Sequence, residues 1–168
     1  MLAAGAGAVI LMYIVDAALP SLFARDLAQV DRVVVLKAER RLMLYAGGER
    51  VATYRVALGS DPIGHKTFRG DSRTPEGLYA LDYRNDESQF HRSIHVSYPN
   101  DADRAAAIEA DVPAGGNVMI HGLPDGNGWI GPVFNLRDWT DGCIAVSNRE
   151  IEEIWQAVPD GTSIEIRP

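Results

Sequence analysis

The chain has 168 residues, enough for one domain with a sizeable hydrophobic core. It carries 16 Lys and Arg against 23 Asp and Glu, a net charge of −7, which argues against nucleic-acid binding because that requires a basic face. One cysteine excludes an internal disulfide and leaves an unpaired thiol.

The N-terminal residues have the composition of a signal peptide or membrane anchor. Residues 2–15 are apolar or small without interruption, a run shorter than the ~20 residues of a membrane span, and no Lys or Arg precedes it. A docked amphipathic helix is the alternative, but the run has no polar face. We expect residues 1–20 to be the signal or anchor, 21–30 a linker and 31–168 the folded domain.

Apolar and β-branched runs predict a mostly β domain with short helices. The first three strands are joined by short turns, which predicts an antiparallel meander that begins a β-sandwich or curled sheet. Strands are expected at residues 33–36, 42–45, 50–57, 78–83, 91–98, 117–121, 144–146 and 162–167. Helices are expected at 102–110, with Asp101 as N-cap, and from a capping box at Ser147 through Val158.

The chemistry of the chain centres on Cys143. A thiol is a nucleophile when a base takes its proton and backbone N–H groups reach the oxyanion that it forms. Gly142, without a Cβ, allows a tight turn and a close approach of substrate. His121 ends an apolar run and is followed by Gly122, which puts a base at a strand end. An inert core thiol and a structural histidine fit these residues equally well.

The motif His121-Gly122, a loop, then Gly142-Cys143-Ile144 resembles the L,D-transpeptidase catalytic domain family (YkuD-like), enzymes of bacterial cell-wall peptidoglycan. Residues 70–77 resemble a further element of the family, and the resemblance covers roughly residues 31–168. It implies an L,D-transpeptidase-like β-sandwich or curled mixed sheet with one C-terminal helix.

The resemblance also implies catalytic roles. His121 would take the proton of Cys143, with the Gly122 carbonyl orienting the imidazole, and the N–H groups of Asp141, Gly142 and Cys143 would stabilise the oxyanion. This mechanism requires an ionised sulfur beside an imidazole in a groove open to solvent. No cofactor or metal is implied.

One position departs from the family, which commonly has His where Asp141 stands. The run 137–143 is similar to a subgroup of periplasmic enzymes that cut the link between peptidoglycan and an attached lipoprotein. The acyl acceptor is therefore an amine (transpeptidation) or water (amide hydrolysis). The implied partners are peptidoglycan stem peptides and a wall-attached lipoprotein, and the implied location is the periplasm or cell envelope, with membrane contact only through the N-terminal segment.

Five further side chains are candidates for binding substrate. Arg69 and Arg73 lie in a basic loop within an acidic chain and suit substrate carboxylates, although a solvated loop with local ion pairs fits as well. Arg137 precedes the cysteine motif and would hold the thiolate or a carboxylate. His95 would line the cleft, and Trp129 would form a wall of the glycine-rich loop 122–131 or pack structurally.

Two other classes of protein remain open. A zinc hydrolase would combine His91 or His95 with His121 and Cys143, but two strand residues four apart lie ~13 Å apart, too far to bind one ion together. A wall-binding module with an inert thiol would have no catalysis at all.

Overall fold

The computed structural model describes residues 11, 18–128, 133 and 135–168. Its centre is one eight-stranded sheet, in the order β3-β2-β1-β8-β4-β5-β6-β7. The strands are β1 (Arg32–Leu36), β2 (Arg41–Ala46), β3 (Glu49–Arg55), β4 (Gly77–Asn85), β5 (Ser93–Val96), β6 (Met119–His121), β7 (Ile144–Ala145) and β8 (Thr162–Arg167). The helices are α2 (Leu19–Leu22), α3 (Asp101–Glu109) and α5 (Asn148–Ala157).

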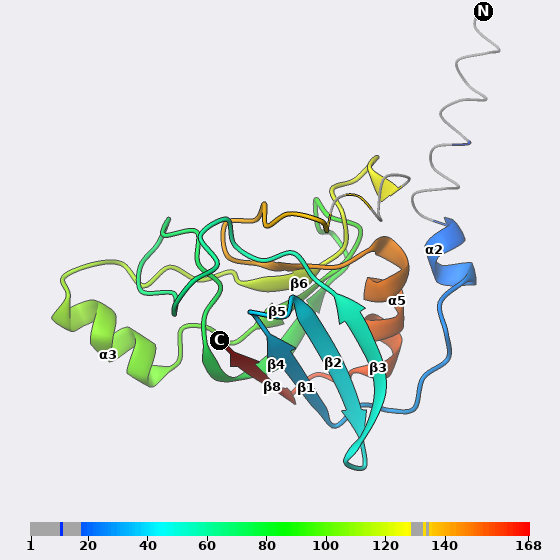
Figure 1. Ribbon diagram of the computed structural model, residues 1–168, viewed down its shortest axis with the longest axis horizontal. Helices are drawn as coiled ribbons and strands as arrows, with labels where there is room; N and C mark the ends of the chain where they lie inside the picture. Colours follow the sequence, from blue (N-terminus) through cyan, green and yellow to red (C-terminus); the bar gives the residue numbers. More distant parts are fainter. Residues whose placement is uncertain (1–10, 12–17, 129–132, 134) are drawn as a thin grey trace, which may run out of the picture.

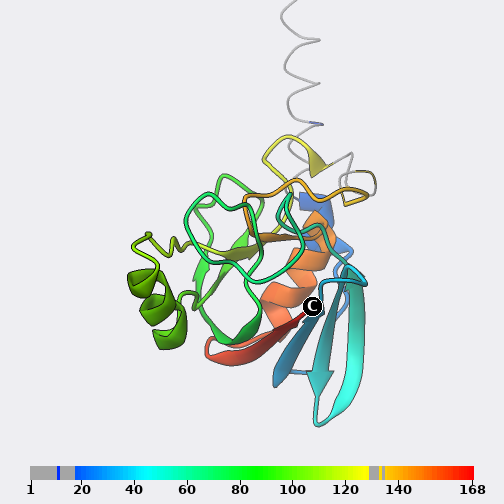
Figure 2. The ribbon, with the colours of Figure 1, turned by 60° about the vertical axis from the view of Figure 1, so that its left-hand side comes forward.

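The sheet is mixed and curled, as expected. The meander β1-β2-β3 is antiparallel, whereas β8 pairs in parallel with β1 and β7 in parallel with β6. Figure 2 shows the meander set at an angle to β4 and β5. The C-terminal strand β8 joins the two parts, because it lies between β1 and β4.

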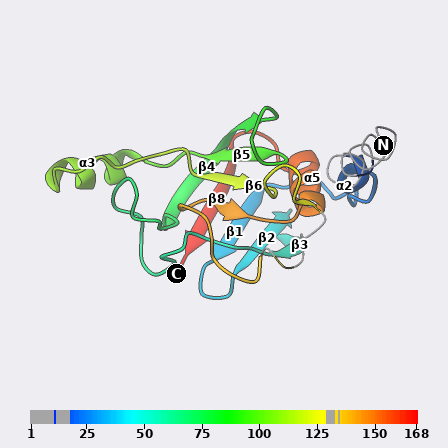
Figure 3. The same cartoon turned by 90° about the horizontal axis from the view of Figure 1, so that it is seen from above.

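Buried apolar side chains on one face of the strands build the core. Val33 and Val35 of β1 are fully buried, as are Leu42 and Leu44 of β2. Side chains two residues apart share a face of a strand, so these residues cover one side of the sheet. The apolar side of α5 packs into the same core, while α3 lies at the opposite end of the molecule from α5 and α2 (Figure 1 and Figure 3).

Two sequence-based boundaries need correction. The N-cap of α3 is Asn100, not Asp101: its side chain accepts from the N–H of Asp103, whose carboxylate accepts from the N–H of Asn100. The strand expected at 91–98 is confined to β5, because the N–H of His91 bonds the carbonyl of Leu123 in a loop. The capping box of Ser147 and Glu150 at α5 is confirmed.

The segment before β1 lies against α5. Arg25 donates its backbone N–H and its guanidinium to the buried carboxylate of Glu153, and the N–H of Val30 bonds the carbonyl of Ala157 at 2.8 Å. Residues 21–30, expected as a linker, are therefore fastened to the domain at several points. Most of the segment 1–20 lies outside the described residues, and none of the helices described is both long and apolar enough to cross a bilayer.

Candidate active site

The neighbouring strands β6 and β7, at one end of the sheet, bring His121 and Cys143 together. Ile120 pairs with Ile144, and His121 pairs with Ala145, in parallel register. Extending this register by one residue sets Cys143 opposite Met119, so the side chains of Cys143 and His121 project from the same face of the sheet. Both line one groove of about 540 Å³, called here the His121 groove, whose other wall comes from residues 83–93.

His121 is buried and held in one tautomer. Its Nδ1 lies 2.6 Å from the carbonyl oxygen of Gly122. A carbonyl only accepts, so Nδ1 carries the proton and Nε2 is left as a proton acceptor. The ring of Phe90 lies over the imidazole at 4.1 Å between centroids. Burial lowers the pKa of His121 to about 4, against the opposing effect of its bond to Gly122. The imidazole is therefore neutral at physiological pH.

Close packing requires glycine at position 122. A Cβ there would lie 2.9 Å from the side-chain oxygen of Asn148 and 3.0 Å from the Cβ of His91. The same Asn148 oxygen accepts the N–H of Leu123 at 2.8 Å. The first turn of α5 thus fixes the chain just after β6, and with it the carbonyl that orients His121.

Cys143 is a half-buried, protonated thiol at rest. Its Sγ lies 3.7 Å from the carbonyl oxygen of Asn117. Burial raises the pKa of Cys143, and the charge of Asp141 raises it further, while the N–H of Met119 and the charge of Lys66 lower it to a lesser degree. The sulfur is therefore not ionised in the resting protein, contrary to the expectation from sequence, and ionisation must accompany a reaction.

Thr140 shapes the turn that carries the thiol. Its buried hydroxyl donates to the carbonyl of Cys143 at 2.8 Å and accepts the N–H of Gly142 at 3.1 Å. Gly142 has φ +122°, and a Cβ would lie 2.5 Å from the carbonyl oxygen of Arg73, so no other residue fits. The N–H of Gly142 is thus engaged, whereas those of Asp141 and Cys143 have no partner within the described part of the chain.

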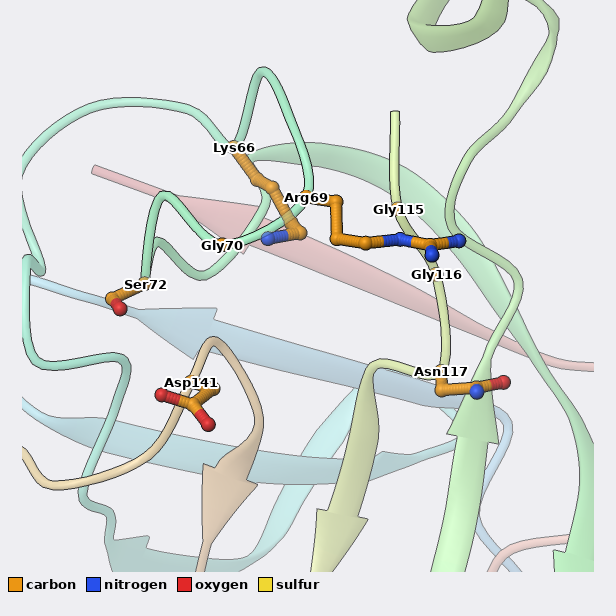
Figure 4. Close-up of a pocket in the computed structure, with 8 residues that line it drawn as sticks. All are labelled: Lys66, Arg69, Gly70, Ser72, Gly115, Gly116, Asn117 and Asp141. Atoms are coloured by element: carbon orange, nitrogen blue, oxygen red, sulfur yellow. The ribbon is translucent and has the colours of Figure 1, made fainter. Parts of the chain in front are cut away.

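A second cavity, of about 660 Å³, shares one lining residue, Asn117, with the His121 groove. We call it the Arg69 cavity. Figure 4 shows its walls: Lys66, Arg69, Gly70 and Ser72 from one loop, Gly115, Gly116 and Asn117 from the chain before β6, and Asp141 from the turn before β7. Cys143 therefore lies near the junction of two hollows with different linings.

The other predicted binding residues lie apart from both cavities. Arg73 pairs with Asp61 at 3.0 Å, and His95 pairs with Asp82 at 2.6 Å. His95 also stacks on Tyr83, which lines the His121 groove. Trp129 lies outside the described residues.

Arg137 is exposed on the segment before the cysteine turn. Its neighbour Asp138 pairs with Arg40 at 2.7 Å and accepts the N–H of Leu58 at 2.9 Å. These bonds fasten the segment to the turn between β1 and β2 and to the chain after β3.

The histidines of the zinc alternative are not assembled. His91 bonds the carboxylate of Glu152 at 2.7 Å, and His95 bonds Asp82, so neither joins His121 and Cys143. Among the residues that the structure describes, no three His, Cys, Asp or Glu side chains are grouped to hold a metal ion.

Sequence reasoning missed three residues of this site. Thr140 carried a local signal, because a hydroxyl two residues before a glycine turn often bonds the backbone. Phe90 and Asn117 had no such sequence signal, because only the tertiary structure brings them to the site.

Solved structures of similar fold indicate the class of the protein. The helical cell shape determining protein Pgp2 of Campylobacter jejuni matches with a TM-score of 0.62 at 23% identity, over 84% of this chain and 49% of that chain. An L,D-transpeptidase of Mycobacterium smegmatis matches with a TM-score of 0.56 at 14% identity, over 84% and 59%. The chain has the L,D-transpeptidase fold.

The family follows from sequence. A model of the L,D-transpeptidase catalytic domain (YkuD) matches residues 30–166, and the chain belongs to this family. The candidate L,D-transpeptidase YafK of Escherichia coli K12 is 32% identical over 133 residues, which are 75% of this chain and 46% of that protein. The chain thus spans about half the length of the curated relatives it matches.

Proposed function

We propose that the protein is a cysteine acyltransferase of the L,D-transpeptidase type that acts on peptidoglycan stem peptides. One observation carries the proposal. The Gly122 carbonyl holds the proton of His121 on Nδ1, and this leaves Nε2 as a base in the groove that also contains Cys143. Membership in the family supports the substrate class.

The first half-reaction follows from the neutral resting pair. Nε2 of His121 takes the thiol proton as Sγ of Cys143 attacks a peptide carbonyl, and negative charge moves to the carbonyl oxygen. The N–H groups of Asp141 and Cys143 are the oxyanion donors that the turn leaves unpaired. The C–N bond then breaks, His121 returns its proton to the leaving nitrogen, and a thioester remains on Cys143.

The second half-reaction resolves the thioester. An amine or a water molecule gives a proton to Nε2 of His121 and attacks the thioester carbonyl. The C–S bond breaks, and the sulfur of Cys143 recovers the proton. An amine gives a cross-link, and water gives hydrolysis, including release of a lipoprotein attached to the wall. Asp141, in place of the histidine common in the family, is the feature that keeps the hydrolytic outcome open.

We place this activity in the periplasm or cell envelope, because the substrate lies there. The apolar N-terminal segment would serve as the export signal or anchor.

Purified stem tetrapeptides and lipoprotein-linked muropeptides test the proposal. Mass spectrometry scores cross-linked dimers against trimmed or released products. We expect the wild type to form one or both, and Cys143→Ala to form neither. Full turnover by a folded Cys143→Ala protein would end the proposal. If trimmed or released products form and cross-linked dimers do not, the acyl acceptor is water.

A further inference from the structure

The peptide unit between Gly122 and Leu123 connects His121 to α5. Its carbonyl oxygen lies 2.6 Å from Nδ1 of His121, and its N–H donates to the side-chain oxygen of Asn148 at 2.8 Å. A trans peptide is planar, so its C=O and N–H point in opposite directions. His121 and Asn148 therefore hold the two ends of one rigid unit. The carbonyl cannot turn away from the imidazole unless the bond to Asn148 breaks.

Backbone groups hold the rest of this turn. The N–H of Gly122 donates to the carbonyl of Arg92 at 3.1 Å, and the N–H of His91 donates to the carbonyl of Leu123 at 3.0 Å. These partners are present whatever side chains the chain carries. The bond from the N–H of Leu123 to Asn148 is different, because its acceptor is a side chain. Asn148 is thus a point at which the direction of the Gly122 carbonyl depends on residue type.

The first turn of α5 fixes Asn148 itself. Asn148 follows the N-cap Ser147, whose N–H donates to the carboxylate of Glu150 at 2.8 Å and whose hydroxyl accepts the N–H of Glu150 at 3.4 Å. α5 lies beside the end of β6 (Figure 3), and Asn148 is only 4% exposed. From this depth Asn148 does not reach a substrate, so it can act on the reaction only through the peptide that it holds.

The surroundings of Gly122 leave one direction in which the peptide could move. A Cβ on Gly122 would lie 3.0 Å from the Cβ of His91 and 3.1 Å from Cγ2 of Ile151. His91 is held in turn by Glu152 at 2.7 Å. The third close neighbour is the side-chain oxygen of Asn148, at 2.9 Å. Removing this oxygen would both free the N–H of Leu123 and open space beside the peptide.

The tautomer of His121 depends on the Gly122 carbonyl. A neutral imidazole carries one proton, and the hydrogen bonds of its two nitrogens decide which of them carries it. With the carbonyl in place the proton is on Nδ1, and Nε2 is an acceptor. With the carbonyl turned away the proton can occupy Nε2, and that form cannot take the proton of Cys143. This last step rests on the proposed function, in which His121 is the base.

We propose that Asn148 is a positioning residue for the pair of His121 and Cys143. It holds the N–H of Leu123, fixes the direction of the Gly122 carbonyl and so keeps Nε2 of His121 without a proton. The base is thus set by a side chain of α5 that touches neither the thiol nor the substrate.

Nitrogen-15 NMR of the full chain, labelled at histidine, reads the tautomer of His121 without any substrate. At neutral pH the wild type should show a protonated Nδ1 and an unprotonated Nε2. Asn148→Ala removes the acceptor oxygen and should show both tautomers. Asn148→Asp keeps an acceptor oxygen at the same place and should retain the wild-type pattern.

Asn100→Ala is the matched control. Asn100 also accepts a backbone N–H, that of Asp103 at 3.0 Å, at the N-terminus of α3, which lies at the opposite end of the molecule from α5 (Figure 1). Both alanine variants should be less stable in urea, but only Asn148→Ala should change the tautomer. A wild type with its proton on Nε2, or an Asn148→Ala spectrum identical to that of the wild type, would overturn the inference. Loss of the Nδ1–H form in folded Asn148→Asp would overturn it as well.

Acylation of Cys143 by a stem tetrapeptide separates this inference from the proposed function. Asn148→Ala should lower the rate constant at saturating peptide by about 10- to 100-fold, because fewer molecules hold a correctly placed base. The half-saturating concentration should be unchanged, and Asn148→Asp should restore the rate. A tautomer that depends on Asn148 in a protein that is never acylated would remove the proposed function alone. Acylation of the wild type, with a tautomer that Asn148→Ala leaves unchanged, would remove this inference alone.

Discussion

At the scale of single residues, the neutral state of His121 and Cys143 sets how the site would work. Burial lowers the pKa of His121 and so keeps a proton off Nε2, and burial raises the pKa of Cys143 and so keeps the thiol protonated. In the proposed reaction the pair would therefore exchange a proton during attack, instead of resting as an ion pair. The imidazole can act as a base only while it is unprotonated. The rate of acylation of Cys143 should therefore fall only when the pH approaches the lowered pKa of His121.

This predicts an unusual pH profile for acylation of Cys143. The acylation rate should be constant from about pH 5 to about pH 8. Below about pH 5 it should fall, with a midpoint near the pKa of His121, about 4. Stopped-flow measurement of the acylation rate with a stem tetrapeptide, at a series of pH values, gives this profile. A midpoint near 6.5, the ordinary value for histidine, would show that His121 is exposed or is not the base.

Thr140 gives a second residue-scale prediction. Thr140→Val removes the hydroxyl that bonds the Gly142 N–H and the Cys143 carbonyl, and should lower the acylation rate by about 10- to 100-fold because the turn loses its geometry. The free energy of unfolding should fall by about 1–3 kcal/mol. Thr140→Ser retains the hydroxyl and serves as control. Equal losses in both variants would point to lost packing of the methyl group.

Sequence motifs pointed to His121 and Cys143, which line one groove in the structure, but not to the residues around them. His121-Gly122 and Gly142-Cys143 are each local signals, and their strand-end positions followed from the apolar runs beside them. The stacking of Phe90, the junction at Asn117 and the pairing of Arg73 with Asp61 depend on loops meeting in space. No pattern within one segment encodes these contacts.

At the scale of elements, three distant segments are bonded to carboxylates of α5. Glu152 bonds His91 before β5, and its neighbour Glu153 bonds Arg25 and the hydroxyl of Tyr54. Both carboxylates are buried. Burial raises the pKa of Glu153, but the bonds from Arg25 and Tyr54 outweigh it and lower the pKa overall.

Glu153→Gln tests this anchor. The variant should lose about 2 kcal/mol of unfolding free energy in urea, because a buried hydroxyl and an arginine lose a charged acceptor. Acylation of Cys143 should be unchanged. Glu165→Gln, a matched change in the exposed pair with Arg167, should leave stability unchanged. Equal effects of the two variants would contradict the anchoring role of Glu153.

Prediction of the elements succeeded where the signals were local. The capping box at Ser147 and the alternation of residues 162–167 fixed α5 and β8 to within a residue or so. The insertion of β8 between β1 and β4 was not predictable, because strand order depends on pairing between distant segments. The strand around His95 was too long in prediction, since its apolar pattern continues into loop residues.

At the scale of the whole molecule, buried titratable groups should make the free energy of unfolding fall in two stages as the pH is lowered. His121 has a pKa of about 4 when folded and about 6.5 when unfolded, so the unfolded chain takes up the proton first. The free energy of unfolding should therefore fall by about 3 kcal/mol as the pH falls from about 6.5 to about 4.

The second stage comes from Asp71, Glu152 and Glu153. Their pKa values are lowered on folding, so the stability that they contribute is present above their unfolded values of about 4 and is lost below them. Urea unfolding at a series of pH values measures both stages. His121→Gln should abolish the first stage and keep the second; a wild type equally stable at pH 7 and pH 5 would contradict the buried neutral histidine.

The intact mass of the protein after exposure to a stem tetrapeptide is the most direct test of the account, because it shows covalency and position together. The wild type should gain the mass of the peptide less its terminal amino acid, and digestion should map the added mass to Cys143. Cys143→Ala should gain nothing. A folded wild type that processes the peptide without a thioester on Cys143 at any time point, or with the added mass on another residue, would contradict the account.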